Sequence, residues 1–200
     1  MQDRRNKSES RIIGPQVLIN AYSNGFFPMA EGREGEIFWH SPDPRAIIPL
    51  EKIRMPRSLK QAIKKEGFVF RIDSCFEDVI NACAERVNTW ISQEIINSYI
   101  ILHKLGYAHS VETFRDGELA GGLYGVAIGG AFFGESMYTS VSNASKAAFY
   151  ELAKHLVSRG FILLDTQYIN DFTESLGAME ISRNQYMTLL NKAIGLQCRF

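Results

Sequence analysis

Three predicted strands joined by two very short glycine turns constrain the fold of this chain more than any other feature. The residues over 108–115, 118–128 and 131–138 are typical of strands, and the dipeptides Asp116-Gly117 and Gly129-Gly130 separate them. Two-residue turns of this kind connect antiparallel neighbours, because their twist matches that of paired strands. The sequence therefore predicts an antiparallel meander.

Further predicted elements extend and cover this sheet. The apolar run 161–165 follows a helical segment and predicts a buried strand parallel to its neighbour. Ser74 and Glu77 have the spacing of a capping box at a helix start. The expected order is helix 58–66, strand 68–73, helix 75–86, a helix from about 93 that ends at Gly106, the three meander strands, helix 143–158 and strand 161–165.

This order is similar to the layout of acyl-CoA N-acyltransferase (GNAT)-like domains. We therefore expect an α/β fold, with a mixed sheet covered by helices, over residues 52–200. Residues 1–51 contain several prolines after a first helix near Val17–Tyr22, which leaves room only for short extended pieces around Phe38 and Ile47. We expect these residues to form a small N-terminal subdomain.

Charge and cysteine content exclude several classes of protein. Lys and Arg together number 22, as do Asp and Glu, so a polyanion would have to bind a local cationic patch. Three cysteines without CxxC spacing favour neither a disulfide framework nor a zinc site. The charged N-terminus and the lack of a long apolar run lead us to expect a cytoplasmic protein.

Standard nucleotide-binding motifs are absent from the sequence. The glycine-rich stretch 121–125 lies inside a predicted strand and lacks both the Walker lysine and the Rossmann spacing. In N-acetyltransferases of this layout a glycine-rich loop for coenzyme A follows the third meander strand, where this chain has the sequence TSVSNASK over 139–146. We therefore expect an acyl donor other than coenzyme A, and no dissociable cofactor or metal.

Several uncommon short sequence motifs occur in this chain in the same order as in one protein family. They lie over residues 21–29 (AYSNGFFPM), 39–45 (WHSPDPR), 89–91 (TWI), 108–112 (AHSVE), 121–125, 133–137 (FGESM), 143–146 (NASK), 165–167 (DTQ) and 175–178 (SLGA). Because of these motifs the chain resembles leucyl/phenylalanyl-tRNA–protein transferases. Phe172 departs from the family, which often has histidine there.

The resemblance implies an aminoacyltransferase (leucyltransferase) activity. Such enzymes move leucine or phenylalanine from aminoacyl-tRNA to the α-amine of proteins that begin with Arg or Lys, and so mark them for degradation by the N-end rule. The expected partners are leucyl-tRNA, phenylalanyl-tRNA and these proteins, with no membrane.

Three polar residues are the candidates for catalysis. Aminolysis of an ester needs an oriented neutral amine, a group that takes its proton, and donors for the oxyanion. Asp165 and Gln167 are two apart at a strand end, so they point to the same side. The resemblance implies that they orient the amine and the carbonyl, with Asp165 as proton acceptor, and that Glu135 contacts the basic N-terminal residue or the aminoacyl-adenosine. A solvated strand end and a structural ion pair are the alternatives.

The resemblance also implies the substrate-binding residues. Trp90 would lie beside the terminal adenosine, where stacking on an indole contributes about 1–3 kcal/mol. The other candidates lie in matching positions around the leucyl or phenylalanyl side chain or in the first matching motif; they are Leu123, Phe132, Met137, Leu152, Leu164, Tyr22 and Met29. Ordinary core packing is the alternative for each of them.

A cationic stretch is the candidate tRNA-binding surface. Its candidate residues are Arg57, Lys60, Lys64 and Lys65, of which the first three share one helical face. A solvated face is the alternative.

Two other functions remain open at this point. One is a coenzyme A-dependent N-acetyltransferase, which the missing glycine loop disfavours. The other is a noncatalytic adaptor that binds tRNA or peptide, which the presence of Asp165, Gln167 and Glu135 together disfavours.

Overall fold

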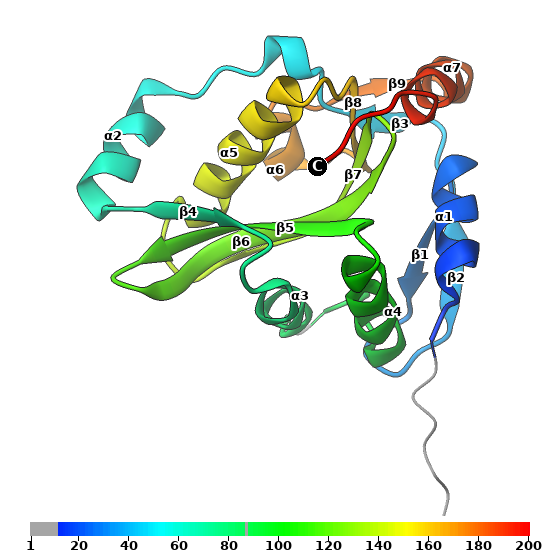
Figure 1. Ribbon diagram of the computed structural model, residues 1–200, viewed down its shortest axis with the longest axis horizontal. Coiled ribbons are helices and arrows are strands. Elements are labelled where there is room, and N and C mark those ends of the chain that lie inside the picture. The colour runs from blue at the N-terminus through cyan, green and yellow to red at the C-terminus, as the bar shows by residue number, and fades with distance from the viewer. Residues whose placement is uncertain (1–11, 87) are drawn as a thin grey trace, which may run out of the picture.

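A computed structural model describes residues 12–86 and 88–200 of the chain. Its main sheet has seven strands in the order β4-β5-β6-β7-β8-β3-β9 (Figure 1). The strands are β3 (Arg45–Ile47), β4 (Val69–Ile72), β5 (Ala108–Arg115), β6 (Glu118–Ile128), β7 (Ala131–Thr139), β8 (Leu163–Gln167) and β9 (Met179–Ile181). A separate hairpin consists of β1 (Phe27–Ala30) and β2 (Ile37–His40).

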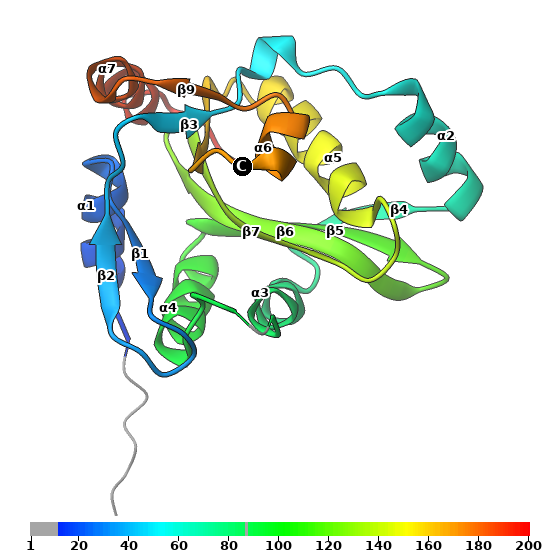
Figure 2. The same cartoon turned by 180° about the vertical axis from the view of Figure 1, so that it is seen from behind.

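Helices cover both faces of the main sheet, as the two opposite views show (Figures 1 and 2). The helices α2 and α5 lie on one face, and α3 and α4 lie on the other. The helices are α1 (Pro15–Ser23), α2 (Arg57–Glu66), α3 (Phe76–Ala84), α4 (Gln93–Lys104), α5 (Ala144–Ser158), α6 (Asp171–Ser175) and α7 (Arg183–Ile194), with a short 3₁₀ turn, η1, at Leu50–Lys52.

The predicted meander and the strand after it are confirmed. β5, β6 and β7 pair antiparallel, and β8 then pairs parallel to β7 after the crossover helix α5. The mixed sheet with helices on both faces is the α/β, N-acyltransferase-like arrangement that the order of elements predicted. Gly121 on β6 permits the close approach of α5, because a Cβ atom there would lie 2.7 Å from the Cβ of Ala144.

The parallel pairing of β7 and β8 is short, and this opens the sheet. Only Ala131–Phe133 pair with Leu163–Asp165. The next residues along the two strands, up to Glu135 and Gln167, have no ladder partner across this gap. A sheet that separates in this way leaves room for a ligand between two neighbouring strands.

The segment 26–50 forms more structure than its prolines indicate. Short extended pieces near Phe38 and Ile47 are confirmed as β2 and β3, whereas β1 was not predicted. β3 pairs antiparallel with both β8 and β9, so a strand from the first quarter of the chain lies in the main sheet between two late strands.

The predicted capping box at Ser74 and Glu77 is wrong. α3 begins at Phe76 after Cys75, and no side chain caps it. The hydroxyl of Ser74 instead donates to Glu112 Oε2 over 3.0 Å, and Ser110 donates to the other oxygen of this fully buried carboxylate. Local spacing could not reveal that a buried carboxylate on β5 competes for the Ser74 hydroxyl.

None of the helices in the described residues is long and apolar enough to cross a membrane.

Candidate active site

A cavity of about 860 Å³ lies beside the gap between β7 and β8. Apolar side chains form one part of its wall: Leu123 of β6, Leu152 of α5 and Leu164 of β8. Glu135 of β7 and Gln167 of β8 form a polar part of the wall. The cavity therefore brings an apolar pocket next to a carboxylate and a carboxamide, which is the arrangement expected where an apolar acyl group meets a polar reactant.

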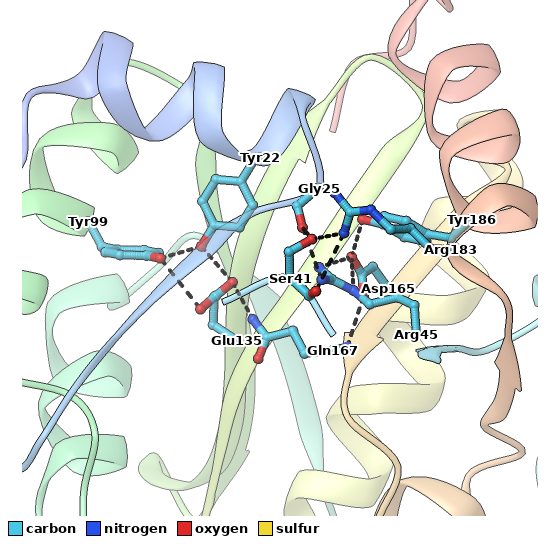
Figure 3. Close-up of polar contacts among 10 residues, drawn as sticks. All are labelled: Tyr22, Gly25, Ser41, Arg45, Tyr99, Glu135, Asp165, Gln167, Arg183 and Tyr186. Carbon is cyan, nitrogen blue, oxygen red and sulfur yellow. Dashed lines mark hydrogen bonds and ion pairs between the residues drawn. The ribbon is translucent and has the colours of Figure 1, made fainter. Parts of the chain in front are cut away.

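Glu135 is surrounded by neutral hydrogen-bond donors (Figure 3). The Tyr22 hydroxyl donates to its Oε1 over 2.7 Å, and the side-chain amide of Gln167 donates to the same atom over 3.0 Å. Tyr99 donates to Oε2 over 3.4 Å, and its hydroxyl also hydrogen-bonds that of Tyr22. No cation forms an ion pair with Glu135 within the described residues.

This environment makes Glu135 a titratable group near neutral pH. Burial raises the pKa of Glu135 to about 7, while the hydrogen bonds from Tyr22 and Gln167 oppose the shift. Burial also raises the pKa values of Tyr22 and Tyr99 well above their ordinary value, so both phenols stay protonated and act as donors. A carboxylate with a pKa near 7 is well placed to exchange a proton with an amine.

Asp165 belongs to a second network, which contains a cation. Arg45 contacts it in a bidentate manner, with Nη2 to Oδ2 at 2.7 Å and Nε to Oδ1 at 3.0 Å, and both side chains are almost fully buried. The Tyr186 hydroxyl donates to Oδ2 over 2.6 Å. The guanidinium of Arg45 lies over the rings of Phe27 and Tyr186 and also donates to the Gly25 carbonyl. Both oxygens of the Asp165 carboxylate thus accept hydrogen bonds.

Gln167 joins the two networks (Figure 3). Its backbone N–H donates to Asp165 Oδ1 over 2.8 Å, whereas its side-chain amide donates to Glu135. Its φ of +67° is in the left-handed region, which is uncommon for a residue other than glycine. The hydrogen bond that the Gln167 N–H donates to Asp165 therefore stabilises the backbone conformation that directs the Gln167 side-chain amide toward Glu135.

The structure separates the predicted catalytic and substrate-binding residues into two groups. Those that line the cavity are Glu135, Gln167, Met29, Trp90, Leu123, Met137, Leu152 and Leu164. Asp165, Tyr22 and Phe132 do not line it. Tyr22 and Asp165 contact residues that do, whereas Phe132 is fully buried and stacks on Phe200 at a ring distance of 5.4 Å.

The geometry also decides among the alternatives for the polar candidates. Asp165 is fully buried and Gln167 is 6% exposed, so neither lies at a solvated strand end. Asp165 takes the structural ion pair that was an alternative for Glu135. Trp90 is partly buried, packs against the core and also lines the cavity, so its predicted contact with the adenosine stays a prediction.

Sequence reasoning did not single out Arg45, Tyr99 or Tyr186. Arg45 lies in the matching motif WHSPDPR, which was the one available signal for it. Tyr99 and Tyr186 lie at buried positions of α4 and α7, where an aromatic residue reads as ordinary core.

The cationic candidates Arg57, Lys60, Lys64 and Lys65 all lie on α2. Each is exposed, and none forms an ion pair with another described residue. They do not line the cavity. Elsewhere in the described residues, no group of three or more His, Cys, Asp or Glu side chains is arranged to hold a metal ion.

Comparison with known proteins places the chain in one family. Residues 47–191 match the family described as leucyl/phenylalanyl-tRNA protein transferase, and residues 13–43 match its N-terminal domain. The chain is 51% identical to the leucyl/phenylalanyl-tRNA–protein transferase of Gloeobacter violaceus, over 94% of this chain and 97% of that protein. It is 50% identical to the protein of the same name from Chlorobaculum tepidum, over 94% of this chain and 100% of that protein.

Solved structures give more distant matches. L-PGS from Bacillus licheniformis is 14% identical and aligns with a TM-score of 0.49 over 92% of this chain and 72% of its own.

Proposed function

The chain belongs to the leucyl/phenylalanyl-tRNA–protein transferase family, an aminoacyltransferase family that acts on aminoacyl-tRNA and protein N-termini, and from this premise we propose its substrates and the roles of its residues. The donors are leucyl-tRNA and phenylalanyl-tRNA. The acceptors are cytoplasmic proteins that begin with Arg or Lys, and transfer marks them for degradation by the N-end rule. No dissociable cofactor takes part.

One observation carries this proposal. An apolar pocket and a buried carboxylate with a pKa of about 7 line the same cavity. The pocket suits a leucyl or phenylalanyl side chain, and the carboxylate suits the removal of a proton from an attacking amine.

We assign proton acceptance to Glu135. The α-amine of the acceptor attacks the ester carbonyl, the new C–N bond forms, and a proton passes from the amine to the carboxylate. The ester C–O bond then breaks, and the terminal ribose leaves with a proton returned from Glu135. Its neutral partners allow Glu135 to be protonated without losing an ion pair.

We assign a positioning role to Asp165 in place of the proton acceptance that the resemblance implied. Protonation of Asp165 would weaken its bidentate contact with Arg45, and Asp165 does not line the cavity. Asp165 acts through the N–H of Gln167, whose side-chain amide lies beside Glu135 and can orient the ester or the amine.

The donor side chain would bind between β6, α5 and β8. This part of the cavity is lined by Leu123, Met137, Phe149, Leu152, Leu164 and Leu176. A methyl group misplaced in a packed site costs about 1–3 kcal/mol, so a β-branched donor such as valine or isoleucine is disfavoured.

The tRNA itself would extend from the cavity over α2. The terminal adenosine stacks on Trp90 near Met29, and the exposed cations Arg57, Lys60, Lys64 and Lys65 contact the phosphate backbone. Substitution of Lys64 by alanine should then weaken all tRNAs alike and reduce the slope of log affinity against log salt by about one.

The test is incubation with labelled leucyl-tRNA and a peptide that begins with arginine, with acetyl coenzyme A in a parallel reaction. We expect the label to pass to the free peptide and not to its N-terminally acetylated form. Transfer from acetyl coenzyme A would instead support an N-acetyltransferase. Tight tRNA binding without any transfer would support a noncatalytic adaptor.

A further inference from the structure

The first turn of α5 contains a buried polar group that the proposed reaction does not use. Ser145 is only 7% exposed and lines the cavity, yet its hydroxyl has no hydrogen-bond partner among residues 12–86 and 88–200. A hydroxyl on a cavity wall that has no protein partner can donate one hydrogen bond to a bound group and accept others from it. The Ser145 hydroxyl is therefore available to a ligand on this part of the cavity wall.

The electrostatics of the same turn favour an anion. α5 has 15 residues, no acidic residue in its first turn, and no side-chain cap from Asn143. The N–H groups at such a helix start carry a partial positive charge; that of Ala144 donates to the Val141 carbonyl, which leaves those of Ser145 and Lys146 as the free ones in this turn. The next residue, Lys146, adds a full positive charge and has no carboxylate partner within the part of the chain that the structure describes.

Lys146 lies between the cavity and the helix proposed to bind tRNA. Its ammonium is 5.6 Å from the ring centroid of Phe172, which lines the cavity. Lys146 also lines a smaller hollow of about 160 Å³, together with Pro56, Ser58 and Leu59 at the start of α2. Ser145 lines the cavity, Lys146 lines the hollow and Leu176 lines both, so the two spaces are neighbours at the first turn of α5.

We propose that Ser145, Lys146 and the first turn of α5 bind the phosphate on the 5′ side of the terminal adenosine of the donor tRNA. The proposal rests on the proposed function, since it needs an aminoacyl-adenosine in the cavity. A nucleic acid that runs from the cavity to α2 passes this turn, and its first phosphate meets one hydroxyl, one ammonium and free N–H groups. An acceptor peptide with a basic N-terminus would be repelled by Lys146.

The experiment compares two minimal donors that differ only by this phosphate. One is the 3′-leucyl ester of adenosine, and the other is the 3′-leucyl ester of adenosine 5′-monophosphate. The value of kcat/KM is measured for each with an arginine-starting peptide. We expect wild type to prefer the phosphorylated donor about tenfold, the scale of one charge-assisted hydrogen bond.

The variants Ser145→Ala and Lys146→Gln should reduce this preference to about twofold or less, because each removes a phosphate contact. The matched control is Lys154→Gln on the same helix, where the lysine is exposed and pairs with Glu151, and it should keep the wild-type ratio. Both donors are assayed on one preparation, so a change in the folded fraction cancels from the ratio.

The outcomes separate this inference from the proposed function. If wild type uses both esters equally well, the phosphate site is wrong although aminoacyl transfer stands. The site is also wrong if wild type prefers the phosphorylated donor and both variants keep that full preference. If neither ester nor leucyl-tRNA supports transfer, the proposed function itself is wrong.

Discussion

Two buried carboxylates, Asp165 on β8 and Glu135 on β7, differ in the charge of their hydrogen-bond partners. Asp165 faces a guanidinium held between two aromatic rings, whereas Glu135 faces two phenols and a carboxamide. A cation stabilises the ionised form of a buried acid, whereas neutral donors only partly offset the cost of burial. Burial alone therefore does not determine the role of a carboxylate. The partner decides whether a carboxylate anchors the structure or exchanges a proton.

Removal of the cation from the Asp165 network should destabilise the fold strongly. In Arg45→Met the Asp165 charge stays buried without its partner, and we expect the free energy of unfolding at pH 7 to fall by about 3–5 kcal/mol. Denaturant titration measures this. The control is Arg54→Met, because Arg54 is exposed and donates only to backbone carbonyls, so a change of about 0.5 kcal/mol or less is expected. Equal losses in the two variants would contradict an anchoring role for Asp165.

Glu135→Gln tests the other network. The amide has nearly the same shape but accepts a proton poorly, so we expect single-turnover transfer from leucyl-tRNA to fall about 100-fold or more. Thermal unfolding checks that the variant is folded. Glu118→Gln on the same sheet is exposed and should transfer at the wild-type rate. Near-normal transfer in Glu135→Gln would return proton acceptance to Asp165.

The same substitution should change how stability depends on pH. The pKa of Glu135 rises from 4.5 to about 7 on folding, so the folded state holds a proton that the unfolded state has released between these values. This contribution to stability is fully present below pH 4.5 and is lost as the pH rises through about 7. The difference in unfolding free energy between wild type and Glu135→Gln, measured across this range, should therefore fall with rising pH. A flat difference would show that Glu135 titrates alike in both states.

Single Tyr→Phe substitutions in the two networks should have smaller effects, which appear in the midpoint of the pH–rate profile. Tyr22→Phe removes one of the two donors that lower the pKa of Glu135, so the midpoint of the pH–rate profile should move upward by up to about one unit. Tyr186→Phe removes a donor to Asp165 instead and should leave the midpoint in place. Equal shifts in both variants would show that the networks titrate as one.

Short-range patterns explain how much of the fold was predictable. The turns at Asp116-Gly117 and Gly129-Gly130 determine which strands pair without reference to the rest of the chain. β3 and β9 have three residues each and little pattern of their own. Their place in the sheet depends on pairing with strands far away in the sequence, which no local signal reveals.

The site was predictable only in part for a similar reason. The motifs shared with the family indicated Glu135, Asp165 and Gln167. The roles of the two acids, however, depend on partners such as Arg45, which is 120 residues from Asp165 in the sequence. Leu123 and Phe132 are both apolar residues of the predicted meander, so there was no reason in the sequence to assign them different roles. Only the packing shows that Leu123 faces the cavity while Phe132 stacks on Phe200.

The insertion of β3 between β8 and β9 affects the order in which the chain can fold during translation. Arg45 leaves the ribosome early, whereas Asp165 and the strand that covers the far side of β3, Met179–Ile181, emerge much later. Contacts of such long sequence separation carry a large loop-closure cost and form late. A nascent chain therefore lacks the Arg45–Asp165 pair, and with it the support of the Gln167 backbone, until β8 has emerged and folded back onto β3.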